Sequence, residues 1–295
     1  MIDELRNLKV GKVIKNPKFT DYTTYKLSGN ALALVMPETV EKLIILINYL
    51  KENNIKHKII GNGSNLIFNT YYDGILINLS KFDNLEINKN IITVGAGYSL
   101  VKLAMKTAKL GLTGLEFATG IPGTVGGAVF MNAGAYKSDM GYFVKSVKVL
   151  TPDYQIKTLT NKELAFKYRT SFLQKNPEYI CLEATIVLKK GKIDVIMNLI
   201  NNRKKRRLDT QPLAYRSAGS VFRNPPNEIA GKIIEELGFK GKKIGDALVS
   251  NKHANFIINV GNARGEDIKT LIEDIKKEVE EKKSIELVVE QEFVE

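Results

Sequence analysis

The residue types that build the common catalytic centres are scarce in this chain. It contains one Cys, Cys181, and two His, His57 and His253, and its carboxylates are not clustered at the spacing of metal ligands. The chain therefore has few of the residues that a metal centre, a thiol nucleophile or a catalytic triad requires. If the protein is an enzyme, we expect a bound cofactor to carry the difficult chemistry.

Two glycine-rich loops offer backbone in place of reactive side chains. The stretch GIPGTVGGAVFMNAGAY, residues 120–136, holds five Gly, and GNGSN starts at Gly61 directly after a predicted strand. Neither loop completes a G-x-G-x-x-G or P-loop pattern. Gly lets a ligand approach the main chain closely, and consecutive N–H groups suit a diphosphate. The two loops together favour a long dinucleotide over the alternative, ordinary tight turns between elements.

Composition narrows the class of protein further. The 295 residues are 44% hydrophobic, enough for two domains. No apolar run reaches the length of a membrane span, and the start, MIDELRNLKVGK, lacks the apolar region of a secretory signal. We therefore expect a cytoplasmic protein without membrane partners. The net charge of +12 comes mostly from Lys scattered among Glu, and the dense run RKKRRL at 203–208 has no interleaved aromatic residues. This pattern favours small anionic ligands over nucleic acid.

Periodicity predicts a mixture of strands and helices. A helix is predicted around 40–50, and a second one from an N-cap at Ser99 to a C′ residue at Gly111. Strands are predicted between 143 and 190, followed by a helix over 192–208. SAGSVF, NFIINVG and the terminal IELVVEQEFV are predicted as strands, and NEIAGKIIEELG and GEDIKTLIEDIKKEVEEK as helices. Because strands and helices do not alternate strictly, the fold class is α+β, with a boundary near 190–210.

Five motifs in fixed order carry a family resemblance. They are GNGSNL, GLEFATGIPGTVGGAVFMNAGAY, YRTSF, SAGSVFRNP and KHANFIIN. From about Tyr22 to Glu290 the chain resembles the UDP-N-acetylenolpyruvoylglucosamine reductases of peptidoglycan synthesis, the MurB family, in its shorter class. The resemblance implies non-covalently bound FAD, NADPH as co-substrate and the enolpyruvyl ether of a UDP-sugar as substrate. Alternatives are another flavin oxidoreductase of the same fold, acting on a sugar or an alcohol, and a basic nucleotide-binding or nucleic-acid-binding module.

The resemblance also implies a domain plan. An N-terminal segment, 1–20, would precede an FAD-binding domain of the vanillyl-alcohol-oxidase (PCMH) type over 21–195. That domain would have two subdomains, about 21–80 and 81–195, and a smaller α+β substrate-binding domain would follow over 196–295.

Site residues are carried over position by position from the motifs. The resemblance implies catalytic roles for Arg169, for Ser220 as proton donor and for Glu290. No metal is expected, because ligand residues are scarce. It implies substrate contacts from Tyr136, Tyr168 and Asn224. The implied cofactor-binding residues are Gly61, Asn62, Gly63, Ser64, Asn65, Gly120, Gly123, Thr124, Gly126, Gly127 and Ala128.

The chain departs from the family pattern beside the catalytic carboxylate. Gln291 and Glu292 follow Glu290, where an apolar and a basic residue are common. Glu292 shares the predicted strand face of Glu290 and is the alternative catalytic carboxylate. Arg223 also stands where the motif usually has Lys.

Overall fold

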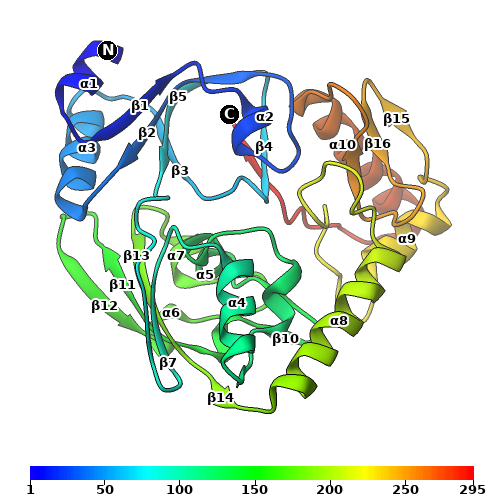
Figure 1. Ribbon diagram of the computed structural model, residues 1–295. Helices are drawn as coiled ribbons and strands as arrows, with labels where there is room; N and C mark the ends of the chain where they lie inside the picture. Colours follow the sequence, from blue (N-terminus) through cyan, green and yellow to red (C-terminus); the bar gives the residue numbers. More distant parts are fainter. The chain divides into compact units, whose positions relative to one another are not determined.

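The computed structural model describes all residues, Met1–Glu295, and the chain forms two compact units. Unit 1 comprises Met1–Ile14, Leu34–Gly61 and Ile75–Lys204, and unit 2 comprises Lys15–Ala33, Asn62–Gly74 and Lys205–Glu295. The chain thus passes from one unit to the other several times, through β1 (Gly11–Lys15), β2 (Asn30–Pro37), β5 (Tyr71–Asn78) and α8 (Ile193–Thr210) (Figure 1). The domain bounds implied by the resemblance describe binding roles and stay a prediction.

Unit 1 is built on an antiparallel sheet with the strand order β12-β11-β13-β7-β6. The register sets Val147 opposite Ala184 and Ala184 opposite Val94, and all three are fully buried. Their alternation with polar residues gives the sheet one face that packs into the core of the unit. The strands are β6 (Leu85–Asn88), β7 (Ile91–Gly95), β11 (Val144–Leu150), β12 (Ile156–Thr160) and β13 (Ile180–Val187).

The two predicted N-terminal helices are confirmed. Helix α3 (Val40–Glu52) is capped by Thr39, and α4 (Leu100–Lys109) by Ser99, whose hydroxyl accepts the N–H of Lys102. Gly111 follows α4 with φ of +70°, the left-handed conformation expected of a C′ glycine. Helix α5 (Val125–Phe130) packs against β13.

The remaining elements of unit 1 are short. They are α1 (Ile2–Asn7), β3 (His57–Ile60), β8 (Leu112–Thr113), η1 (Glu116–Gly120), β9 (Gly134–Ala135), β10 (Ser138–Asp139), η2 (Met140–Tyr142), α6 (Asn161–Leu164), α7 (Phe172–Lys175) and β14 (Lys189–Lys190). Strand β3 pairs in parallel with β5 in the sheet of order β1-β2-β5-β3.

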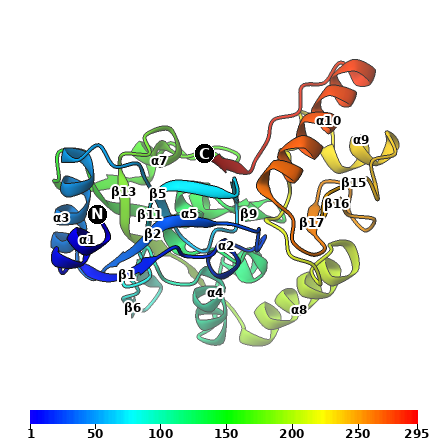
Figure 2. The same cartoon turned by 90° about the horizontal axis from the view of Figure 1, so that it is seen from above.

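Unit 2 pairs a three-stranded antiparallel sheet with a long helix. The sheet has the order β15-β16-β17, and α10 packs against β15 and β16 (Figure 2). Apolar residues at helical spacing in α10, among them Ile268, Leu271 and Ile275, are buried in this core. The elements are α2 (Phe19–Tyr22), β4 (Leu66–Phe68), α9 (Ala230–Glu236), β15 (Lys243–Ile244), β16 (Ala247–Val249), β17 (Ile257–Asn259), α10 (Gly265–Lys283) and β18 (Glu292–Val294).

Two predicted strands of unit 2 are wrong in extent. SAGSVF forms a turn with a single bridge, Phe222 to Val289, because Gly219 takes a φ of +76° that interrupts extended backbone. The terminal alternating run is a regular strand only over β18, which pairs in parallel with β4. Its earlier part, residues 288–290, pairs with residues 221–223 instead. The run predicted as one strand therefore pairs with two different segments.

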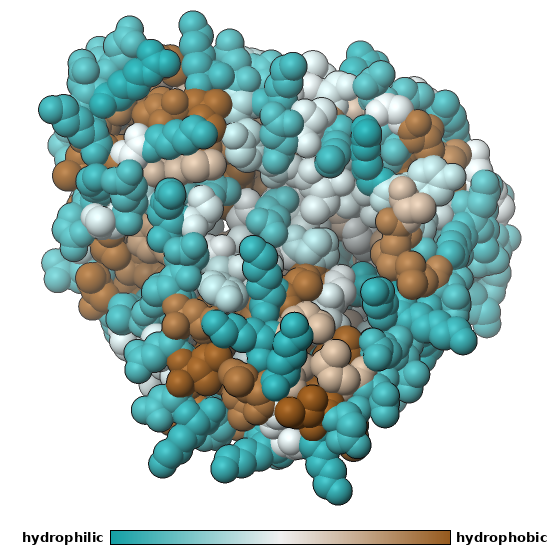
Figure 3. Space-filling view, viewed as in Figure 1, coloured by the Kyte–Doolittle hydropathy of each residue, from teal (hydrophilic) through white to brown (hydrophobic).

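The helices and the ionisable side chains show no feature that indicates a membrane span or a metal site. The face in Figure 3 is covered mostly by hydrophilic side chains, with small apolar patches between them. None of the helices combines the length and the apolarity needed to cross a lipid bilayer. No cluster of three or more His, Cys, Asp or Glu side chains could hold a metal ion. Cys181 is a free, buried thiol, and burial raises its pKa to about 12.

Within unit 2, one buried amide holds the segment around Tyr25 in place. Asn259 at the end of β17 is 3% exposed, and its Nδ2 donates to the carbonyls of Tyr25 and Lys26, both at 3.0 Å. Its Oδ1 accepts the N–H groups of Gly261 at 3.0 Å and Ala263 at 3.1 Å. Four main-chain groups from two segments thus depend on one side chain.

We predict that Asn259→Leu lowers the free energy of unfolding by about 3 kcal/mol or more. The change conserves volume, but it leaves buried main-chain groups without partners, each at a cost of about 1–3 kcal/mol. Urea unfolding followed by circular dichroism measures the loss. Asn262→Leu, at an exposed neighbour in the same loop, should change stability by less than about 0.5 kcal/mol. Equal stability of the two variants would contradict the role given to Asn259.

Candidate functional site

Ser220 and Glu290 are brought together by main-chain pairing inside unit 2. Phe222 forms an antiparallel bridge with Val289, and the N–H of Glu290 donates to the carbonyl of Val221 at 2.8 Å. The N–H of Arg223 donates to the carbonyl of Val288 at 2.9 Å. The predicted proton donor and the predicted carboxylate, which are far apart in the sequence, therefore lie on adjoining segments of backbone. Both side chains are half-buried.

The other side of the Ser220 segment is held by Asn255 of the KHANFIIN motif. The buried amide of Asn255 accepts the N–H of Phe222 at 2.9 Å and donates to its carbonyl at 2.8 Å. Its main-chain carbonyl accepts the N–H of Val221 at 2.9 Å. Two of the motifs that carry the resemblance thus form one hydrogen-bonded structure.

The first glycine loop is tied to the same carboxylate strand. Asn65 donates from its side chain to the carbonyl of Glu290 at 3.0 Å, and its own carbonyl accepts the N–H of Glu292 at 2.9 Å. Asn65 was predicted to bind the cofactor, and in the structure its side chain also fixes the strand on either side of Gln291. Glu292 belongs to β18, whereas Glu290 pairs with the Ser220 segment.

The same loop has the features of an anion-binding turn. The N–H groups of Gly63 and Ser64 donate to no acceptor within the protein, while the carbonyl of Gly63 accepts the N–H of Thr24. Two successive N–H groups without protein partners suit a phosphate oxygen. This observation agrees with a pyrophosphate of FAD at Gly61, Asn62, Gly63, Ser64 and Asn65, which stays a prediction.

In the second glycine-rich run most N–H groups are used within unit 1. Gly126 donates to the carbonyl of Ala96 at 2.8 Å, and a Cβ at Gly126 would lie 2.9 Å from the Cβ of Ala96. The glycine is thus required by close packing of the chain, a reason that the sequence alone did not reveal. Gly127 is exposed, and only Thr124 Oγ1, at 3.4 Å, lies near its missing Cβ. The cofactor contacts predicted for this run at Gly120, Gly123, Thr124, Gly126, Gly127 and Ala128 remain untested by these contacts.

Arg169 stands at the tip of a two-residue hairpin in unit 1. Lys167 and Thr170 exchange both of their main-chain hydrogen bonds, which places Tyr168 and Arg169 in the loop between them. Arg169 has φ of +53°, a left-handed conformation that costs a non-glycine residue about 1 kcal/mol. Its Nη2 donates to the carbonyl of Gly134 at 2.7 Å. Strain of this kind is often kept at functional positions.

The end of the glycine-rich run anchors that hairpin. Buried Asn132 donates to the carbonyl of Lys167 at 2.8 Å and accepts the N–H of Gly141 at 2.9 Å. Ser171 Oγ donates to the carbonyl of Phe130 at 2.6 Å. The FMNAGAY part of the motif thus positions the Tyr168–Arg169 tip.

The three predicted substrate contacts have different environments. Tyr168 is 53% exposed and its ring lies 5.1 Å from the Arg169 guanidinium. Tyr136 donates its hydroxyl to the carbonyl of Arg203 at 3.1 Å, under the Arg203 guanidinium. The Asn224 side-chain oxygen accepts the N–H of Ala230, the first residue of α9, at 3.1 Å. Tyr136 and Asn224 therefore have structural partners in addition to the substrate roles predicted for them.

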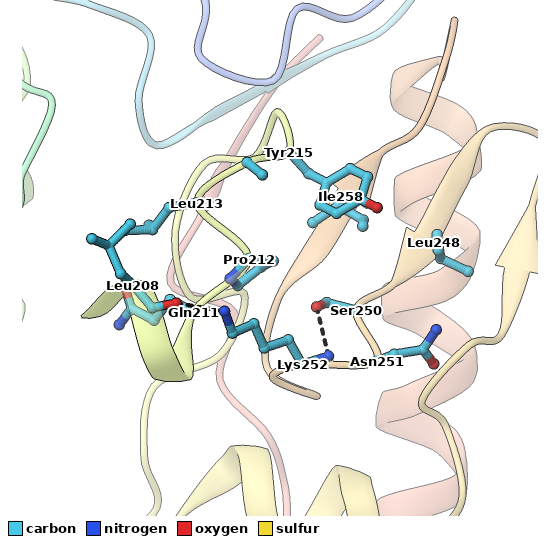
Figure 4. Close-up of a pocket in the computed structure, with 11 residues that line it drawn as sticks. Leu208, Gln211, Pro212, Leu213, Tyr215, Leu248, Ser250, Asn251, Lys252 and Ile258 are labelled. Carbon is cyan, nitrogen blue, oxygen red and sulfur yellow. Dashed lines mark hydrogen bonds between the residues drawn. The ribbon is translucent and has the colours of Figure 1, made fainter. Parts of the chain in front are cut away.

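Unit 2 contains a cavity of about 370 Å³ between the end of α8 and the β16–β17 sheet (Figure 4). The side-chain oxygen of Gln211 is buried there and accepts no hydrogen bond from the protein. Ser250 Oγ accepts the N–H of Lys252 at 3.1 Å, and the Lys252 ammonium donates to the carbonyl of Leu208. The lining combines these polar groups with Pro212, Leu213, Tyr215, Leu248 and Ile258.

Sequence reasoning missed the amides that position the site. Asn132, Asn255 and Gln211 were not predicted as functional residues, although Asn132 and Asn255 stand inside motifs that were recognised. The partners of Asn132 and Asn255 are main-chain groups of other segments, which no local pattern reveals. Position within a recognised motif is the one signal that could have found two of them.

Comparison with known proteins assigns both parts of the chain. The FAD binding domain family matches residues 31–160, and the UDP-N-acetylenolpyruvoylglucosamine reductase C-terminal domain family matches residues 211–294. The UDP-N-acetylenolpyruvoylglucosamine reductase of Bacillus licheniformis is 44% identical, with 100% of this chain and 98% of that protein covered. The enzyme of the same name from Bacillus subtilis is 42% identical over the same shares of the two chains.

A solved structure agrees over almost the whole length. The crystal structure of UDP-N-acetylenolpyruvylglucosamine reductase (MurB) from Thermus caldophilus superposes with a TM-score of 0.81 at 32% identity, covering 96% of this chain and 98% of that one. The predicted α+β FAD-binding fold with a C-terminal domain is confirmed, and so is FAD as the cofactor. The chain belongs to the UDP-N-acetylenolpyruvoylglucosamine reductase (MurB) family of FAD-dependent oxidoreductases.

Proposed function

We propose that the protein reduces UDP-N-acetylenolpyruvoylglucosamine to UDP-N-acetylmuramate with NADPH, a step in the synthesis of peptidoglycan precursors in the cytoplasm. Family membership supports the substrate and the reaction. The observation that supports it most is the pairing of Glu290 with Val221, which sets a hydroxyl and a carboxylate on adjoining segments. The direct test is product mass. The enolpyruvyl sugar nucleotide should gain two hydrogens in the presence of NADPH and none without it.

When bound, FAD would supply the hydride chemistry that links NADPH to the terminal vinyl carbon of the substrate. The residues that would hold it are the loop around Gly63 and Ser64, with two N–H groups for a phosphate oxygen, and the exposed backbone at Gly127. Neither loop provides a His for a covalent link to the flavin, which agrees with non-covalent binding.

Arg169 would hold the carboxylate of the enolpyruvyl group. Hydride addition to the vinyl carbon leaves negative charge on the neighbouring carbon, and this charge spreads into the carboxylate. A guanidinium can bind a carboxylate through two parallel hydrogen bonds and stabilise that charge. The strained hairpin and the bond to Gly134 fix the position from which Arg169 acts.

Ser220 would donate the proton that completes the lactyl ether. A serine hydroxyl is a weak acid, so it can protonate only a strongly basic centre such as the carbanion left by hydride transfer. Glu290, on the adjoining segment, would tune the charge that develops at this carbon. The catalytic roles of Arg169, Ser220 and Glu290 rest on the motif match and on this arrangement.

The cavity of unit 2 would receive a polar part of the sugar nucleotide. Its buried Gln211 oxygen lacks a donor, and a uracil or acetamido N–H supplies one. The Lys252 ammonium adds positive charge to the lining, which suits a ligand that carries a diphosphate.

For Arg169 we predict a loss confined to one half of the reaction. Arg169→Lys keeps the charge and loses the planar fork, so a bidentate contact is broken. Flavin bleaching by NADPH should keep its rate within about twofold, while reoxidation by the enolpyruvyl substrate should slow by about tenfold or more. Stopped-flow absorbance separates the two steps. Equal slowing of both would show that Arg169 supports the fold or the flavin.

For Ser220 we predict a larger loss in the same step. Ser220→Ala should leave flavin binding and bleaching by NADPH intact and slow reoxidation by about 10²–10⁴-fold, the range for a lost general acid. Ser220→Cys should recover part of that rate, because a thiol is the stronger acid. If Ser220→Ala reoxidises at the wild-type rate, the proton comes from another group.

For Gln211 we predict weaker substrate binding with unchanged chemistry. Gln211→Leu should raise KM for the enolpyruvyl sugar nucleotide about threefold to tenfold, the worth of one neutral hydrogen bond. The kcat and the KM for NADPH should stay unchanged. Steady-state kinetics with each substrate varied in turn measure the split. An unchanged KM for the sugar nucleotide would show that the cavity does not bind this substrate.

A further inference from the structure

Gln291 is a buried amide directly beside Glu290 and is 4% exposed. Its Nε2 faces three successive carbonyl oxygens, those of Ala218 at 3.2 Å, Gly219 at 3.3 Å and Ser220 at 3.4 Å. Its Oε1 accepts the hydroxyl of Tyr25 at 3.0 Å. The side chain therefore connects the carboxylate strand with the turn that carries Ser220.

The chemistry of these partners fixes which way the amide points. Carbonyl oxygens only accept hydrogen bonds, so the NH₂ group must face the turn and Oε1 must face Tyr25. Tyr25 must then donate, and burial raises the pKa of its hydroxyl well above the usual value, which keeps the proton in place. Tyr25 is itself held at its main chain by Asn259. The direction of the Gln291 amide is thus determined by the three carbonyls, which can only accept hydrogen bonds.

The centre of the turn has no side chain to hold it. Gly219 has φ of +76°, and no heavy atom lies within 4 Å of the place where its Cβ would be. Side-chain packing therefore does not fix the turn at Gly219. Ala218 beside it is buried in the core of unit 2, so that packing and the hydrogen bonds of Gln291 together hold the turn. Gln291 is a rigid base for these hydrogen bonds, because the N–H groups on either side of it, those of Glu290 and Glu292, are bonded to Val221 and Asn65.

We propose that Gln291, oriented by Tyr25, is a positioning residue for Ser220: it holds the three carbonyls of the Ala218–Ser220 turn and so sets the place from which the Ser220 hydroxyl delivers its proton. This inference rests on the proposed function of Ser220. Gln291 touches neither the reacting carbon nor the proton in this account, and it acts through the turn alone.

The first experiment is a double-mutant cycle on the two half-reactions of the flavin-loaded enzyme. Gln291→Met keeps the length of the side chain and removes its hydrogen bonds. In wild-type background it should slow reoxidation by the enolpyruvyl sugar about ten- to a hundredfold, since a misplacement of about 1 Å can cost a hundredfold. In the Ser220→Ala background the same change should slow it less than about twofold, because the two residues act as one unit. Tyr25→Phe should give a smaller loss in the same step.

A core variant separates positioning from general destabilisation. Val279→Ala removes two methyl groups from the same hydrophobic core of unit 2, where Val279 is fully buried. It should lower the melting temperature and leave both half-reactions unchanged. Equal slowing by Gln291→Met in both Ser220 backgrounds, or slowing of flavin bleaching as well, would overturn the proposal.

The second experiment needs no substrate and so distinguishes failure of this inference from failure of the proposed function. In Ser220→Cys the new thiol can be labelled selectively with a maleimide, because Cys181 is buried. Adding Gln291→Met should raise the labelling rate about fivefold as the half-buried turn loosens, and adding Val279→Ala should not. An unchanged labelling rate would overturn the role of Gln291. If the labelling rate rises but the protein does not reduce the enolpyruvyl sugar, the proposed function is wrong. The role of Gln291 in holding the turn would still be supported.

Discussion

The antiparallel pairing of residues 221–223 with residues 288–290 is the constraint on which the candidate site depends. It joins a turn near the start of the C-terminal part of the chain to its last segment, through hydrogen bonds between main-chain groups. These bonds are made by main-chain groups, so they position Ser220 and Glu290 without using either side chain. The amides of Asn255 and Asn65 bond to the paired segments themselves, and Gln291 bonds to the turn that precedes them. Buried amides suit this task, because each donates and accepts at once and so specifies one arrangement of backbone.

In unit 1, hydrogen bonds from side chains to main-chain groups position Arg169 in a similar way. The hairpin that presents Arg169 takes a left-handed conformation that an arginine does not adopt without cost. Asn132 and Ser171 hold the ends of that hairpin against the glycine-rich run. The succession of small residues therefore has two physical reasons in one unit: close packing at Gly126 against Ala96, and the fixing of a strained turn.

Local patterns predicted the elements that are themselves local. The apolar spacing of α3, the serine cap of α4 and the glycine after it were all readable from the sequence and are confirmed. SAGSVF and the terminal run were wrong as strands, because pairing with a distant partner and the positive φ of Gly219 decided their conformation. The motifs predicted Ser220 and Glu290 as site residues, but nothing in them shows that Gln291 reaches three carbonyls or that Tyr25 orients it. Hydrogen bonds between segments far apart in sequence depend on the tertiary fold, which periodicity does not encode.

The most direct measurement of the account is the visible spectrum of the purified protein through one anaerobic cycle. The account predicts oxidised-flavin absorption bands, their bleaching by NADPH, and their return on addition of UDP-N-acetylenolpyruvoylglucosamine but not of UDP-N-acetylglucosamine. A colourless protein that cannot be reconstituted with FAD would contradict it. So would a reduced protein whose colour returns only when oxygen is admitted, because electrons would then reach oxygen and not the enolpyruvyl carbon.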